Sequence, residues 1–136
     1  MKSITSAITS VGGYVPETVL TNFDLEKMVD TNNEWIISRT GIKERRILKD
    51  KSLGTSFMAI NAANKLLQEK DVNPTSIDLV IVSTATPDMP VSSTASFVAT
   101  EIGASNAFGY DIQGACSGFL FGMSAACAHI CSGRYR

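Results

Sequence analysis

A cysteine stands among small residues in the run Tyr110-Asp-Ile-Gln-Gly-Ala-Cys-Ser-Gly-Phe-Leu120. The run predicts a strand that ends, a sharp turn at Gly114 and a helix that begins close to Cys116. A thiol at a helix start faces unpaired N–H groups and the positive end of the helix dipole, which favour its nucleophilic thiolate form. The Cys116 N–H could also donate to an oxyanion. The sequence therefore predicts a nucleophile at Cys116; the alternative is a small buried hydrophobic residue, the commonest role of free cysteine.

A metal site is a second interpretation of the same region, because three cysteines and the only histidine of the sequence, His129, are close together. Helix geometry argues against it, since Cys116 and Cys127 would be ~16 Å apart along the axis. His129 would point ~140° away from Cys116. Cys127 and Cys131 could touch as an i, i+4 pair, but two sulfurs make an incomplete zinc site. We expect no metal site, and we expect the two later cysteines to be core residues.

An aromatic and a basic side chain, Trp35 and Arg39, are four residues apart and fall on one face of a predicted helix. An indole beside a guanidinium suits an adenine nucleotide. The alternative is that Trp35 buries its ring on a short helix. A basic stretch follows, which could meet phosphates or an acidic partner protein, or could form a solvated face offset by nearby carboxylates. Its members are Lys43, Arg45, Arg46, Lys49 and Lys51.

The elements that must position these side chains alternate between strand and helix. We expect strands over 3–11, 78–84 and 107–112, and helices over 22–29, 33–39, 55–70, 92–102 and 115–132. Expected helix caps are Asn22 and either Asn32 or Asn33, with Gly41 as a stop. The helix over 55–70 is the clearest, because its apolar residues fall within an arc of ~120°. These are Ala59, Ile60, Ala63, Leu66 and Leu67. Strands separated by helices predict an α/β fold with a parallel sheet.

Composition limits the classes of partner. Of 136 residues, 44% are hydrophobic and 18% charged, which is typical of a folded protein. The net charge of −1 gives no field for nucleic acid or acidic membranes. No stretch approaches ~18 uninterrupted apolar residues. We therefore expect no nucleic-acid or membrane partner, a cytoplasmic location and, with three cysteines near one end, no disulfide framework.

Two motifs resemble the β-ketoacyl-acyl carrier protein synthase III family of thiolase-fold condensing enzymes. Asp111-Ile-Gln-Gly-Ala-Cys-Ser-Gly-Phe119 is similar to the family's nucleophile segment. Thr31-Asn-Asn-Glu-Trp-Ile-Ile-Ser-Arg-Thr-Gly-Ile-Lys-Glu-Arg-Arg46 resembles its coenzyme A-binding helix. The motifs stand in the family's order, and the resemblance spans essentially the whole sequence. It implies a thiolase-like α/β fold.

The resemblance also implies roles for individual residues. Cys116 would take an acyl group, most simply acetyl, from acyl-CoA as a thioester. Trp35 would stack on the adenine, while Arg39 and Thr31 would contact the nucleotide or pyrophosphate. The loop Pro87–Val91 would line an acyl pocket across a homodimer interface. The acyl-enzyme would then condense with malonyl-acyl carrier protein, losing CO₂, to start fatty acid synthesis; no tightly bound cofactor is expected.

One departure from the family limits what the sequence encodes. The family's catalytic His and Asn lie in a second half of similar fold that the sequence lacks, and His129 does not match that histidine. We therefore expect residues 1–136 to be a truncated N-terminal thiolase-like half-domain, inactive alone. The alternatives are a 3-hydroxy-3-methylglutaryl-CoA synthase or polyketide-type synthase, or a non-catalytic scaffold. A hydrolytic or redox cysteine protein ranks last, because no suitable His and no Cys-x-x-Cys pair is present.

Overall fold

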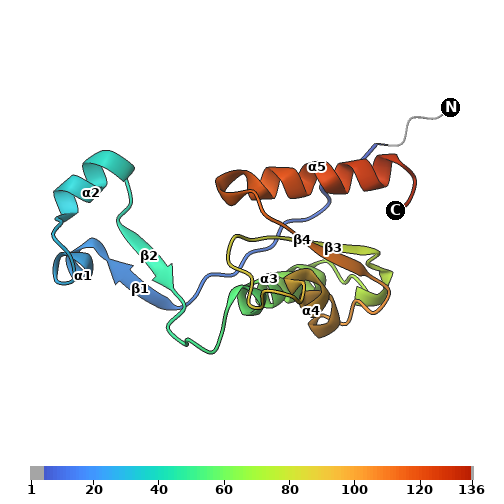
Figure 1. Ribbon diagram of the computed structural model, residues 1–136, viewed down its shortest axis with the longest axis horizontal. Coiled ribbons are helices and arrows are strands. Elements are labelled where there is room, and N and C mark those ends of the chain that lie inside the picture. Colours follow the sequence, from blue (N-terminus) through green and yellow to red (C-terminus); the bar gives the residue numbers. More distant parts are fainter. Residues whose placement is uncertain (1–4, 136) are drawn as a thin grey trace. The chain divides into compact units, whose positions relative to one another are not determined.

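The computed structural model describes residues 5–135. These residues form two compact units: the larger contains residues 5–14 and 54–135, and the smaller contains Val15–Leu53. The elements are drawn in Figure 1, which labels the α-helices and the strands. In chain order they are β1 (Thr18–Thr21), α1 (Asn22–Glu26), α2 (Asn33–Thr40), β2 (Glu44–Ile47), α3 (Thr55–Glu69), the 3₁₀ turn η1 (Pro74–Ser76), β3 (Leu79–Ser83), α4 (Thr94–Glu101), β4 (Phe108–Ile112), the 3₁₀ turn η2 (Ala115–Ser117) and α5 (Gly118–Cys131).

The larger unit is built around a pair of parallel strands, as the sequence predicts. β3 and β4 run side by side from the pair Leu79 and Phe108 to the pair Ser83 and Ile112. Helix α4 makes the crossover between them, and it packs on both strands. Figure 1 shows α5 on one side of the strand pair and α3 with α4 on the other. The α/β class and the parallel pairing are therefore confirmed.

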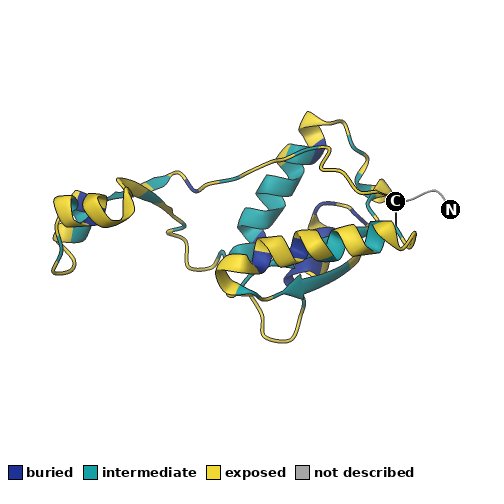
Figure 2. Cartoon of the chain, turned by 90° about the horizontal axis from the view of Figure 1, so that it is seen from above, coloured by how far each residue is buried: buried dark blue, intermediate teal, exposed yellow. Residues whose placement is uncertain are grey.

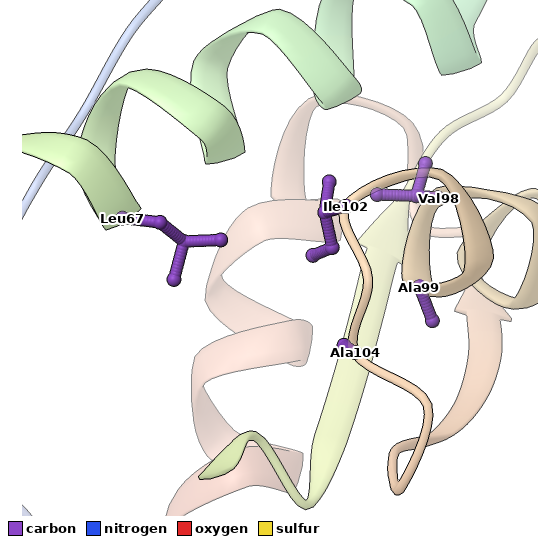
Figure 3. Packing of buried hydrophobic residues seen from close by; sticks show 5 residues of the cluster. All are labelled: Leu67, Val98, Ala99, Ile102 and Ala104. Carbon is purple, nitrogen blue, oxygen red and sulfur yellow. The ribbon is translucent and has the colours of Figure 1, made fainter. Parts of the chain in front are cut away.

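A small apolar cluster holds α3 and α4 against the strands. Its buried members are Leu67 from α3 and, from α4 and the turn after it, Val98, Ala99, Ile102 and Ala104 (Figure 3). The predicted stripe of α3 is confirmed, because its remaining apolar residues pack against this cluster. Gly103 follows α4 at φ 79°, a left-handed conformation that glycine adopts without strain.

The smaller unit pairs two short strands with two short helices. β1 and β2 are antiparallel, with Thr18 opposite Ile47 and Thr21 opposite Glu44. Asn32 caps α2 by accepting a hydrogen bond from the Trp35 N–H at 2.8 Å, and Gly41 ends the helix at φ 70°. Both expectations for this helix are confirmed.

Three local predictions are wrong. No strand occurs within 5–11, while residues 3–4 lie outside the described part; β-branched residues favour extended backbone, but a strand requires a paired neighbour, and Ile8 and Val11 are exposed instead. The first short helix ends at Glu26, and Thr21 rather than Asn22 caps it, because Thr21 and Asp24 form a reciprocal capping box. The strands β1 and β2 were not predicted.

The last helix is exposed along much of its length (Figure 2). Phe119, Leu120 and Phe121 expose 72%, 65% and 53% of their surface, although its composition is apolar all round, a pattern typical of a helix covered by other protein. No helix in the described residues combines the length and apolar character that crossing a membrane requires.

Candidate active site

The candidate nucleophile lies where the two parallel strands end. Parallel strands finish at the same edge of a sheet, and here the Thr84 N–H donates to the Ile112 carbonyl at 3.1 Å, just beyond the paired residues. The chain then turns through Gln113 and Gly114 into η2, which carries Cys116, and continues into α5. Cys116 is exposed. The predicted order of strand, turn, cysteine and helix is thus confirmed, with the cysteine in a 3₁₀ turn directly before the α-helix.

The turn that presents Cys116 is conformationally demanding. Ala115 has φ 43°, in the left-handed region that costs an L-residue about 1 kcal/mol or more. A Cβ added to Gly114 would lie 2.5 Å from Cδ2 of Phe121 and 3.1 Å from Cα of Gly118, so a larger residue here would require the Phe121 ring to move. Among the described residues, no acceptor pairs with the Cys116 N–H. The turn therefore exposes both the thiol and a backbone donor, as an acyl-transfer site needs.

Close packing on β3 fixes the start of α5. The Ser83 hydroxyl donates to the Gly118 carbonyl at 2.9 Å. A Cβ on Gly118 would be 3.5 Å from Cβ of Ser83, and one on Gly122 would be 2.8 Å from its Oγ. The distance at Gly118 is an ordinary contact, whereas the one at Gly122 is too short, so Gly122 is the residue that lets the helix approach the end of β3. This contact between α5 and β3 fixes the helix that directly follows the Cys116 turn.

A carboxylate in β4 ties the same edge of the sheet to α4. Asp111 accepts hydrogen bonds from the N–H groups of Thr94 and Ala95, both at 2.8 Å, and from the Ser93 hydroxyl at 3.2 Å. Burial alone raises the pKa of Asp111, but the hydrogen bonds from Ala95 and Thr94 outweigh it and hold that pKa below its usual value. An ionised Asp111 therefore fastens the N-terminus of α4 to the strand that leads to Cys116.

The remaining cysteines lie farther along α5, and both are exposed, so the expectation that they are core residues is wrong. Their sulfurs are 3.8 Å apart, as i, i+4 geometry predicts. The Ser6 hydroxyl donates to Cys127 Sγ at 3.1 Å and lowers the pKa of that thiol. His129 Nε2 lies 3.1 Å from the Tyr110 hydroxyl. Within residues 5–135 no three His, Cys, Asp or Glu side chains are grouped to hold a metal ion.

The predicted nucleotide-binding pair belongs to the smaller unit. The Arg39 guanidinium lies over the Trp35 ring, 5.0 Å from its centroid, so the structure brings these two residues together. Trp35 is 53% exposed, which excludes burial of its ring in this structure. Thr31 is half-buried and directly precedes Asn32, the cap of the same helix. Cys116 belongs to the other unit.

A cavity of about 940 Å³ in the larger unit is lined by α3, β3 and α5. Ser83 and Phe119 lie at its border, but Cys116 does not line it. The cavity is mostly apolar, and α5, the helix that follows Cys116, forms part of its wall. We assign the candidate active site to the Cys116 turn.

Sequence reasoning missed two residues that position the Cys116 turn, Asp111 and Ser83, and it misassigned Asn22 as a helix cap. A carboxylate inside an otherwise apolar strand is a signal that could have identified Asp111. Ser83 carries no such signal, because its partner lies far away in the sequence. Asparagine is a common helix-capping residue, which is why the sequence predicted a cap at Asn22, but the side chain of Asn22 is buried.

The chain is 53% identical, over all 136 residues, to the β-ketoacyl-acyl-carrier-protein synthase III of Phocaeicola vulgatus. The corresponding protein of Caldanaerobacter subterraneus is 48% identical over 135 residues. Over its whole length, this chain is similar in sequence to proteins of the synthase III family. The chain spans about two fifths of these relatives, 41% and 40% of their lengths. No protein-family model matches it.

Solved structures agree with this family and its thiolase-like fold. The crystal structure of 3-oxoacyl-acyl-carrier-protein synthase III from Aquifex aeolicus is 45% identical with a TM-score of 0.86, over 97% of this chain and 41% of that one. The priming β-ketosynthase of a polyketide biosynthetic pathway is 35% identical with a TM-score of 0.92, over 99% and 40%. The predicted fold class is confirmed.

Proposed function

We propose that Cys116 is the acyl-accepting nucleophile of a condensing enzyme of fatty acid synthesis. The observation that carries the proposal is an exposed cysteine on a strained turn at the end of two parallel strands, with a backbone N–H that has no acceptor among residues 5–135. The sulfur would attack the thioester carbonyl of acyl-CoA, giving a tetrahedral oxyanion that the Cys116 N–H stabilises. Collapse of that intermediate would expel the coenzyme A thiolate and leave the acyl group on Cys116.

In the second step the acyl-enzyme would condense with malonyl-acyl carrier protein. Loss of CO₂ leaves a carbanion equivalent on the malonyl group, which attacks the acyl thioester and releases the Cys116 thiolate. The resemblance implies that a His and an Asn of the family, which these 136 residues do not match, stabilise that carbanion. Condensation is therefore proposed for a protein in which this chain acts together with such a His and Asn, with acyl-CoA as substrate and no tightly bound cofactor.

The nucleotide of acyl-CoA would bind at α2. The adenine would stack on the exposed indole of Trp35, and the Arg39 guanidinium, already 5.0 Å from that ring, would stack beside it or contact the pyrophosphate. Thr31 would contact the nucleotide from the start of the helix. This pair supports coenzyme A as the carrier of the acyl group.

A homodimer is part of the proposal, through the loop Pro87–Val91. Asp88 fastens the base of the loop by accepting from the Ser56 N–H at 3.0 Å, at the start of α3. Beyond it, Met89 is 48% and Val91 97% exposed. An anchored loop with an exposed apolar tip is suited to insert into a second subunit. We place the dimer in the cytoplasm, in line with the sequence-based expectation.

Acylation of Cys116 is testable by mass spectrometry. The full chain is incubated with acetyl-CoA, and its intact mass and peptide map are recorded. We expect one acetyl group on the Cys116 peptide and none in Cys116→Ala. Cys127→Ala is the matched control, because Cys127 is also an exposed thiol, and it should label like the parent protein. Equal labelling of Cys116→Ala would refute the proposal.

A second candidate function is condensation with the malonyl-carrier protein of a polyketide pathway. It is favoured by the TM-score of 0.92 to the polyketide priming β-ketosynthase. The two acceptors are separated by measuring condensation with malonyl groups on carrier proteins from a fatty acid pathway and from a polyketide pathway. We expect the fatty acid carrier to be preferred, since the synthase III relatives are the more similar in sequence.

A further inference from the structure

The side chain of Asn22 is 1% exposed and is the largest fully buried side chain among the described residues. Its amide nitrogen donates to Asn33 Oδ1 at 3.0 Å and to the Ile42 carbonyl at 2.8 Å. Its oxygen accepts from Arg45 Nη1 at 2.7 Å. Both N–H groups and the carbonyl of this buried amide are therefore in use, as burial of a polar group requires.

Two hydrogen-bond partners of Asn22 lie at opposite ends of α2. Asn33 is the first residue of α2, and Ile42 directly follows Gly41, which ends α2. One amide group thus holds both ends of the helix that carries Trp35 and Arg39. Arg45, on β2, fixes the amide from its other side.

Helix α2 has few other anchors. Ile36 is its only buried residue, and Glu26 accepts from the Asn33 N–H at 2.6 Å. Trp35 is exposed and takes part in no apolar core. The orientation of the Trp35–Arg39 pair therefore depends strongly on how the two ends of the helix are held.

We propose that Asn22 is a positioning residue for the nucleotide of acyl-CoA: it sets the orientation of α2 and with it the Trp35–Arg39 clamp. The inference rests on the proposed function of that pair. Asn22 does not touch the ligand; it acts through the helix. Loss of its two donors should weaken nucleotide binding while leaving the chemistry at Cys116 intact.

The decisive variant is Asn22→Asp in the full chain. It keeps the shape of the side chain and the acceptor for Arg45, but it removes both N–H donors. The matched control is Asn61→Asp, which removes an amide donor to the Phe57 carbonyl on α3, in the other unit. Acylation rates are measured with acetyl-CoA and with an acetyl thioester of pantetheine, which has no nucleotide. Fluorine NMR of fluorotryptophan-labelled protein, assigned with Trp35→Phe, reports the surroundings of Trp35.

We expect Asn22→Asp to raise KM for acetyl-CoA about tenfold with kcat within about twofold, and to shift the Trp35 resonance. The rate with acetyl-pantetheine should not change, whereas a general structural defect would lower it. Asn61→Asp should behave like the parent protein. If Asn22→Asp does not fold, Asn33→Ala removes only one of the two tethers and should raise KM about threefold.

Two outcomes separate the failures. If Trp35→Ala raises KM for acetyl-CoA but neither Asn22→Asp nor Asn33→Ala does, the positioning role is wrong and the nucleotide site stands. If Trp35→Ala and Arg39→Ala leave KM unchanged, the proposed nucleotide site is itself wrong. An equal loss of rate with both thioesters would make Asn22 a general structural residue and overturn the inference.

Discussion

Replacing Asp111 by Asn removes one charge from the edge of the sheet that presents Cys116 while keeping the shape of the side chain. The carboxylate accepts two backbone hydrogen bonds of 2.8 Å and one from Ser93. Hydrogen bonds to a charged group contribute about 1.5–3 kcal/mol each, and a carboxylate at a helix N-terminus adds about 0.3–1 kcal/mol. An asparagine retains one acceptor oxygen but turns an NH₂ group toward a backbone N–H. Because Asp111 is only half-buried, we expect a loss near the lower end, about 2 kcal/mol.

The pH dependence follows from the direction of the pKa shift. The pKa of Asp111 in the folded chain lies below its usual value. Its contribution to stability is therefore fully present above the unfolded pKa of about 3.9 and is lost as pH falls through the lower folded pKa. The difference in unfolding free energy between parent and Asp111→Asn should be constant from pH 7 to pH 5 and shrink below about pH 4.

Urea denaturation of the full chain, followed by circular dichroism, measures this difference. With m-values of about 1–3 kcal/mol/M, a loss of about 2 kcal/mol lowers the midpoint by roughly 1 M. Asp30→Asn is the control, because it makes the same change at an exposed position in the smaller unit. A midpoint for Asp111→Asn no lower than that of the control, or a difference that persists unchanged to pH 3, would refute the reasoning.

Three further substitutions test the apolar cluster, the contact between α5 and β3, and the backbone conformation that ends α2. Leu67→Ala should lower the unfolding free energy by about 2–4 kcal/mol, whereas exposed Leu120→Ala should change it by less than about 0.5 kcal/mol; equal effects in urea denaturation would contradict the assigned core. Gly122→Ala should cost about 1–3 kcal/mol, because its new Cβ meets Ser83 Oγ at 2.8 Å. Ser83→Ala in the same chain should recover part of that loss, and strict additivity in a double-mutant cycle would argue against the contact. Gly41→Ala should lower the melting temperature through about 1 kcal/mol of left-handed strain at φ 70°, and an unchanged melting temperature would exclude that backbone conformation.

The parts of the fold that sequence predicted are those set by local periodicity. The apolar stripe of α3 and the apolar run of β3 each carry a pattern over several residues, and both elements are found within a residue or two of their expected ends. Strand β2 has the sequence Glu-Arg-Arg-Ile, which shows no alternation of apolar and polar residues. Its strand character comes from pairing with β1. Non-local pairing of this kind leaves no signal in a single short segment.

In the candidate site, too, the features set by local sequence were predicted and those set by distant contacts were not. The place of Cys116 follows from local order, a strand, a glycine and a helix, and the Trp35–Arg39 contact follows from i, i+4 spacing. The left-handed Ala115 could not be predicted, because alanine rarely adopts that conformation and tertiary packing imposes it. Asn22 was misassigned for a related reason. An asparagine at the start of a helix is a local signal for a cap, but the hydrogen-bond partners of Asn22 are distant in sequence. These partners are Asn33, Ile42 and Arg45.

The position of the apolar cluster along the chain bears on how the protein is made. Every buried member of the cluster, from Leu67 to Ala104, precedes Cys116 and α5. Ribosomes release a chain from its N-terminus at about 5–20 residues per second, so these residues emerge first. The packing of α3 on α4 can thus begin before α5 has emerged from the ribosome. The turn that carries Cys116 then packs on a partly formed core.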